Sequence, residues 1–164
     1  MPPLPFPLKA TFGMKRVLHM ALIAVLLSGV ASGDSITSIG NWTQTINASH
    51  LVAGAGSNLQ SSLASISGTT TIDVNGAQNW TVLARRGTGP WSSGVTLQIK
   101  RTSAGSGAGT ISGGEDFIDI NTSNVTIFSG RSHRNGVALQ YRLTGLSCTV
   151  PPGTYSAPII FTVQ

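Results

Sequence analysis

Charge is scarce in this chain of 164 residues, because Asp, Glu, Lys and Arg together supply only 9% of it. Beyond residue 33 there are seven basic and five acidic residues, which leaves a net charge of +2. A balance this close to neutral lacks the basic surface of a nucleic-acid-binding domain. We therefore expect no nucleic acid among the partners of the protein.

Cysteine and helical periodicity are also nearly absent. The single cysteine, Cys148, cannot form a bridge within the chain, which excludes a disulfide scaffold. Beyond residue 33, no segment repeats apolar residues at the i, i+3 and i+4 positions of a helix for more than one turn. Short alternating runs recur instead, together with many Gly, Ser and Thr residues. This pattern predicts an all-β extracellular protein.

One apolar run does occur, near the N-terminus. Lys15 and Arg16 precede an apolar run from Val17 to Val30, and the small residues Ala31, Ser32 and Gly33 follow it. A basic start, an apolar centre and small residues in this order are typical of a secretory signal peptide. We therefore expect cleavage after Ser32 or Gly33, and a protein that is secreted to the periplasm or the cell surface.

The chain is accordingly predicted to have three parts. Residues 1–33 are an upstream extension and a signal peptide, both removed, and residues 34–57 are an N-terminal extension or a first strand. Residues 58–164 are a β-sandwich domain, and nothing beyond residue 33 is apolar enough to span a membrane. A mature chain of about 131 residues is long enough for one sandwich with its own core.

The last thirty residues predict two strands joined by a corner. In the first strand, Val137, Leu139, Tyr141 and Leu143 alternate with more polar residues, as in a strand with one buried face. The sequence Pro151-Pro152-Gly153 then removes two backbone donors and favours a turn. The terminal strand follows, and its inner face consists of Ile159, Phe161 and Val163.

Other alternating runs bring the total to about seven to nine short strands, spaced as in an immunoglobulin-like antiparallel β-sandwich. Thr70–Val74 and Trp80–Arg85 flank Asn75-Gly76, a pair that favours a tight hairpin turn. The segment Ser103–Thr110 consists of Gly, Ala, Ser and Thr, a composition that predicts a flexible loop. It is not interpreted as a phosphate-binding loop, because no helix N-terminus follows it.

No arrangement of side chains predicts catalysis, a cofactor or a metal ion. Ser132 and His133 are adjacent in an extended turn, where neighbouring side chains point apart, and no carboxylate is identifiable that would orient the histidine. Glu115, Asp116 and Asp119 lack the spacing of a calcium-binding loop, so solvated strand charges explain them better. We therefore expect that the protein is not an enzyme.

The tryptophans leave one binding hypothesis open. Trp80 is in phase with Val82 and is predicted to lie in the core, whereas Trp91 follows a loop and could be exposed to a ligand. The alternative to a structural role is therefore a small extracellular module that binds carbohydrate or another surface ligand through Trp91 and the loops near His133.

The closing segment, with Leu143-Thr-Gly-Leu followed by Pro152-Gly-Thr-Tyr-Ser156 and an alternating terminal strand, resembles the C-terminus of spore coat protein U-like domains and of chaperone–usher pilin subunits. The resemblance covers about the last thirty residues. It implies that Gly153 and Tyr155 hold the corner. It also implies that Ile159, Phe161 and Val163 face a strand donated by a periplasmic chaperone and then by a neighbouring subunit.

The function predicted from these features is that of a secreted structural protein. It would be a surface coat or pilus-like subunit that assembles into a homo-oligomer or filament by β-strand addition, since an unfinished sheet offers backbone groups to an extended segment. A sandwich completed within one chain is the competing possibility.

Overall fold

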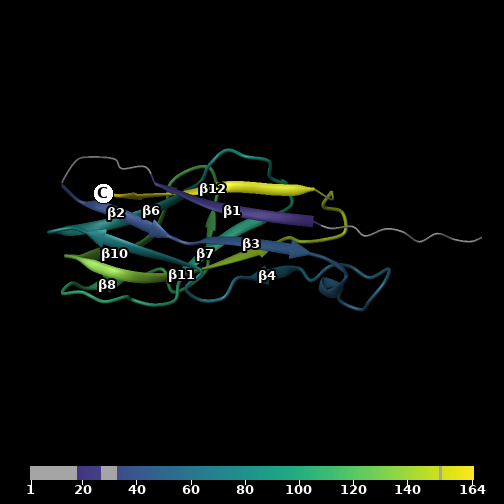
Figure 1. Ribbon diagram of the computed structural model, residues 1–164, viewed down its shortest axis with the longest axis horizontal. Helices are drawn as coiled ribbons and strands as arrows, with labels where there is room; N and C mark the ends of the chain where they lie inside the picture. The colour runs from purple at the N-terminus through teal and green to yellow at the C-terminus, as the bar shows by residue number, and fades with distance from the viewer. Residues whose placement is uncertain (1–17, 27–32, 152) are drawn as a thin grey trace, which may run out of the picture.

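A computed structural model describes residues 18–26, 33–151 and 153–164 (Figure 1). Within these residues the structure consists of strands, turns and one 3₁₀ helix, η1 (Ala48–His50). The strands form two sheets that enclose a common hydrophobic core. The prediction of an all-β sandwich is therefore confirmed. The expected upstream extension, the basic residues of the expected signal peptide and its residues 27–32 lie outside the described part of the chain.

The first sheet, here called the β12 sheet, has the strand order β3-β1-β12-β6-β10-β8. In that order its strands are β3 (Asn41–Ile46), β1 (Leu18–Leu26), β12 (Thr154–Val163), β6 (Asn79–Arg86), β10 (Val125–Arg131) and β8 (Ile111–Ser112).

The second sheet, here called the β11 sheet, has the order β2-β5-β11-β7-β9, and β4 also pairs with β11. Its strands are β2 (Ser35–Ile39), β5 (Thr70–Asn75), β11 (Arg134–Thr144), β7 (Thr96–Arg101), β9 (Ile118–Ile120) and β4 (Ser62–Ala64).

The described residues thus contain more strands than the seven to nine expected. One additional strand is β8, which has two residues, and a second arises because the segment 34–57, expected to hold one strand, forms both β2 and β3. Another is β1, which the sequence assigned to a signal peptide. Every pair of strands is antiparallel except β1 with β12, which run parallel.

The two closing strands provide the centre of the core. On β11, Val137, Leu139, Tyr141 and Leu143 are at most 2% exposed, which confirms the predicted alternation. On β12, Ile159, Phe161 and Val163 are buried in the same cluster. Burial of a large apolar side chain stabilises a fold by about 1.5–3 kcal/mol, so these positions contribute a substantial part of the stability.

The corner between these strands leads from one sheet to the other, since β11 and β12 lie in different sheets. The same is true of the segment 34–57, which supplies one strand to each sheet. Gly40 separates its strands β2 and β3 and has a φ of +119°, and a Cβ atom there would overlap the carbonyl oxygen of Thr69. Glycine is therefore required where the chain changes sheets.

The predicted hairpin at Asn75-Gly76 is wrong. Its flanking strands β5 and β6 lie in different sheets, so the connection arches across the core. Glycine is required at position 76 for a steric reason and not for a left-handed backbone conformation. An added Cβ would lie only 2.6 Å from Cδ1 of Trp80. The Asn-Gly pair signals a turn correctly, but it cannot show which sheet the next strand joins.

The glycine-rich segment 103–110 is held in place by Arg134, which is 9% exposed. Its guanidinium donates hydrogen bonds of 2.8–3.2 Å to the carbonyl oxygens of Ala104, Gly107 and Gly109. A Cβ on Gly107 would overlap a backbone oxygen of the neighbouring segment. Glycine at this position therefore permits close packing, and the segment is not the flexible loop that its composition suggested.

Candidate assembly site

The strand β1 occupies a central position in the β12 sheet. Figure 1 shows it between β3 and β12. His19–Leu26 pair with Thr154–Phe161 in parallel register, and Leu18–Ile23 pair with Ile46–Asn41 in antiparallel register. Among the described strands, β3 pairs with β1 alone. β1 therefore connects β3 to the rest of the sheet, and we call its position between β3 and β12 the β1 slot.

The walls of the β1 slot are apolar on the side that faces the core. The wall on β12 carries the buried residues Ala157, Ile159 and Phe161, and the wall on β3 carries Trp42 and Ile46. Trp42 stacks on the ring of Tyr141 from the opposite sheet, with ring centroids 6.1 Å apart. The slot therefore opens directly onto the centre of the sandwich.

Alternate positions of β1 are in register with these inward residues. Leu22 is paired with both Trp42 and Ala157, whereas Ala24 is paired with Ile159 and Leu26 with Phe161. Paired residues on neighbouring strands belong to the same face of a sheet. A strand in this slot consequently needs apolar residues at every second position.

Two of the three residues predicted for the assembly strand thus lie beside the slot. Ile159 and Phe161 are in register with β1, whereas Val163 lies beyond the end of that pairing and is in register with Val82 of β6. Sequence reasoning missed the opposite wall on β3. Its alternation of Trp42 and Ile46 was visible, but alternation does not reveal which strands face each other.

The predicted corner lies at one end of the slot. Tyr155 donates a hydrogen bond from its hydroxyl to the carbonyl oxygen of Pro151, at 2.8 Å, and its ring packs partly against the core. Met20 is in register with Tyr155. Gly153 is exposed and its φ is not in the left-handed region, and an added Cβ would make only ordinary contacts with the tyrosine ring.

Trp91 is largely engaged within the chain. Its indole nitrogen Nε1 donates a hydrogen bond to the carbonyl oxygen of Val95, at 2.7 Å. One face of its ring is covered by the guanidinium of Arg86, whose Cζ lies 4.7 Å from the ring centroid. Burial lowers the pKa of Arg86. A stacking ligand would therefore have to displace this cation or use the remaining edge of the ring.

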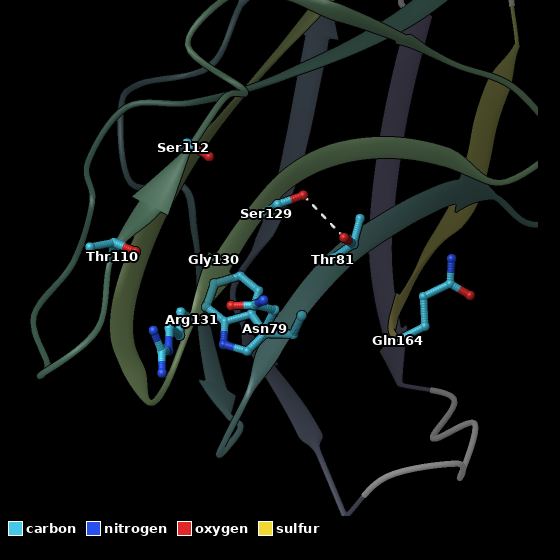
Figure 2. A pocket seen from close by; sticks show the side chains of 9 residues that line it. Asn79, Thr81, Thr110, Ser112, Ser129, Gly130, Arg131 and Gln164 are labelled. Carbon is cyan, nitrogen blue, oxygen red and sulfur yellow. Dashed lines mark hydrogen bonds between the residues drawn. The ribbon is translucent and has the colours of Figure 1, made fainter.

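A polar hollow of about 350 Å³ lies elsewhere, beside the C-terminal residue (Figure 2). Its lining residues are Asn79, Trp80, Thr81, Thr110, Ser112, Ser129, Gly130, Arg131 and Gln164. The hydroxyls of Thr81 and Ser129 lie 3.1 Å apart within it, as Figure 2 shows. The sequence did not predict this hollow, because its residues come from separate strands and no local motif joins them.

Trp80 forms the apolar part of the hollow. It is 2% exposed, its Nε1 donates a hydrogen bond to the carbonyl oxygen of Ser132 at 2.7 Å, and its ring packs edge-on against Phe128. Its predicted position in the core is therefore confirmed. The hydroxyl, amide and guanidinium groups around it offer hydrogen bonds to a small polar solute.

The remaining candidates for chemistry each interact with another residue of the chain. Glu115 forms an ion pair with Arg101 at 2.7 Å, whereas Asp119 accepts a hydrogen bond from Gln98 at 2.6 Å. His50 belongs to the cap of η1, where its Nδ1 accepts the backbone N–H of Asn47. In the described part of the chain, no three His, Cys, Asp or Glu side chains are grouped so that they could hold a metal ion.

Within the described ranges, no helix has the length and apolar character that it would need to cross a bilayer. A scan against protein-family models and a search of curated proteins found no match to the sequence.

Proposed function

We propose that the protein is a secreted structural subunit of a surface coat or pilus-like assembly, and that it assembles by accepting a β-strand in the β1 slot. One observation carries this proposal. The strand that fills the slot, Leu18–Leu26, is the apolar centre of the segment that the sequence assigns to a removable signal peptide.

Removal of that segment would leave the sandwich unfinished. β3 would lose its strand partner, and β12 would keep only β6 as a neighbour. The backbone groups along both walls would lose their hydrogen-bond partners, and a buried unpaired group costs about 1–3 kcal/mol. Trp42, Ile159 and Phe161 would also be uncovered, so an extended segment from another molecule would gain both hydrogen bonds and apolar burial.

The resemblance of the last thirty residues to spore coat protein U-like and chaperone–usher pilin subunits supports the same proposal. In this interpretation a periplasmic chaperone covers the slot before assembly, and Gly153 and Tyr155 hold the corner from which β12 enters the sheet. The protein carries out no reaction and uses no cofactor, and it works in the periplasm or at the cell surface.

Secretion of the full gene product tests the proposal. Mass spectrometry of the exported protein should show an N-terminus at Gly33 or Asp34, since cleavage is expected after Ser32 or Gly33. The exported protein should run on unheated gels as a complex or multimer that heating dissociates. An exported protein that retains residues 18–26 would contradict the proposal, because its own segment would fill the slot.

A small-ligand module is the second candidate, and the polar hollow beside Gln164 favours it. The ligand class would be a small polyhydroxylated molecule such as a sugar, because hydroxyl, amide and guanidinium groups line the hollow. Glycan-array screening of the exported protein would test it, with Arg131→Met expected to abolish any binding at this hollow and Trp91→Ala expected to leave that binding unchanged.

A further inference from the structure

We infer that the strand accepted by this protein comes from a different polypeptide and not from a second copy of the mature chain. This inference rests on the proposed function. If it holds, the protein is an acceptor only, so it occupies one end of an assembly or pairs with a partner that supplies the strand.

The segment that follows the expected cleavage site already forms part of the sandwich. β2 begins at Ser35, and its whole length, Ser35–Ile39, is in register with β5. After Gly40, β3 forms one wall of the slot. A copy that donated residues 34–46 to a neighbour would therefore dismantle a wall of its own slot and remove the neighbour of β5. The mature chain has no spare strand at this end.

Two connecting segments are also held in place within the chain. A donor must supply about nine residues, the length of β1, with apolar residues at alternate positions. The connection 47–61 contains η1 and is tied across by the bridge between Leu51 and Leu59. The segment 103–110 consists mostly of small residues and is held by Arg134. Neither of these two segments could enter a neighbouring slot without loss of its own contacts.

The slot also specifies the partner. The incoming strand runs parallel to β12 and antiparallel to β3, as β1 does. Its positions equivalent to Leu18, Leu22 and Leu26 are in register with inward residues and call for large apolar side chains. The position equivalent to Ala24 is in register with Ile159, where β1 has a small residue. The partner is therefore a protein with an extended segment that has large apolar residues at its first, fifth and ninth positions and a small residue at its seventh.

The experiment uses the exported mature chain, with its N-terminus verified by mass spectrometry, and a synthetic peptide of residues 18–26 with charged solubilising ends. A matched peptide carries Leu22→Asp, which places a carboxylate in register with Trp42 and Ala157. Sedimentation measures self-association of the chain, and thermal melting and fluorescence titration measure peptide binding.

We expect a mature chain that does not associate with itself and binds one peptide. Bound peptide should raise Tm by at least about 10 °C, and the Leu22→Asp peptide should bind at least about 100-fold more weakly because it buries an unpaired charge. If the chain is soluble only when refolded with the apolar peptide, as a one-to-one complex, the inference is equally supported.

Two other outcomes separate the claims. If the mature chain alone forms multimers and the apolar peptide dissociates them, copies of the chain donate strands to each other. That result would overturn the inference and leave the proposed function intact. A folded monomer whose Tm neither peptide changes would show that the slot is closed, and both the inference and the proposed function would fall.

Discussion

The hydroxyl of Tyr141 on β11 donates a hydrogen bond to Oγ1 of Thr70 on β5, and these two oxygen atoms lie 2.9 Å apart inside the core. Both residues are at most 1% exposed. Tyr141→Phe leaves the Thr70 hydroxyl buried without this partner, so we expect the free energy of unfolding to fall by about 1–2 kcal/mol. Chemical denaturation measures the loss.

The matched control for that substitution is Tyr155→Phe, which removes a hydroxyl that bonds Pro151 at the surface. Water can satisfy the freed carbonyl there, so the expected change is within about 0.5 kcal/mol. A loss for Tyr141→Phe no larger than for Tyr155→Phe would contradict the assignment of a buried hydrogen bond.

Burial also makes the stability depend on alkaline pH. It raises the pKa of Tyr141 to about 12, against an ordinary value of 10.0. Between these values the unfolded chain releases the phenolic proton while the folded chain keeps it, so the free energy of unfolding falls as pH rises. The stabilising contribution is complete below pH 10, and about 2–3 kcal/mol is lost by pH 12.

Denaturation midpoints from pH 8 to pH 12 measure this loss. Tyr141→Phe has no phenol to ionise, so its stability should decline less steeply than that of the unchanged protein over the same range. Parallel pH profiles for the two proteins would show that Tyr141 is not the group responsible.

Gly130 lies against the ring of Trp80, and a Cβ atom there would overlap the ring atoms of that tryptophan. Gly130→Ala should therefore displace Trp80 from its core position and destabilise the fold by about 1–3 kcal/mol. Gly94→Ala is the matched control, because the added Cβ would meet only Oγ of Ser92, at 3.9 Å. Thermal melting of the two variants compares them, and equal Tm values would contradict this packing.

Arg134 is the residue that orders the glycine-rich segment. Arg134→Met removes four hydrogen bonds to the carbonyl oxygens of Ala104, Gly107 and Gly109. We expect a loss of about 2–4 kcal/mol and faster amide hydrogen exchange across residues 103–110. The exposed Arg131 offers the control, since Arg131→Met should leave exchange in that segment unchanged. Unaltered exchange in the Arg134 variant would disprove its role.

The faces of single strands were predictable because side chains alternate along a strand. That periodicity located the buried residues of β11 and the inner residues Ile159, Phe161 and Val163 of β12 before any pairing was known. The partners of each strand were not predictable, because pairing depends on contacts far apart in sequence. Asn75-Gly76 was therefore interpreted as a hairpin, although its two strands belong to different sheets.

The candidate site illustrates the same limit. The apolar composition of Leu18–Leu26 is compatible with a signal peptide and with a buried strand, and periodicity alone does not separate a short apolar strand from a helix. The sequence could not show that the same segment fits between β3 and β12. The wall formed by Trp42 and the hollow beside Gln164 likewise depend on residues that only the folded chain brings together.

The register of the slot permits a test by exchange of side-chain size. Leu22 of β1 is in register with Ala157 of β12, which is 1% exposed. In the mature chain, Ala157→Leu should narrow the slot at that position and weaken binding of the peptide of residues 18–26 by at least about 10-fold, because overpacking costs about 1–3 kcal/mol. Fluorescence titration measures the change.

A peptide with Leu22→Ala should restore that binding, because the volume removed from the peptide matches the volume added to the wall. The same peptide should bind the unchanged chain less well, by about 2–4 kcal/mol, since it leaves a cavity beside Ala157. The two substitutions must therefore couple: their combined effect should be smaller than the sum of the separate effects. Strict additivity would place the peptide in another register or outside the slot.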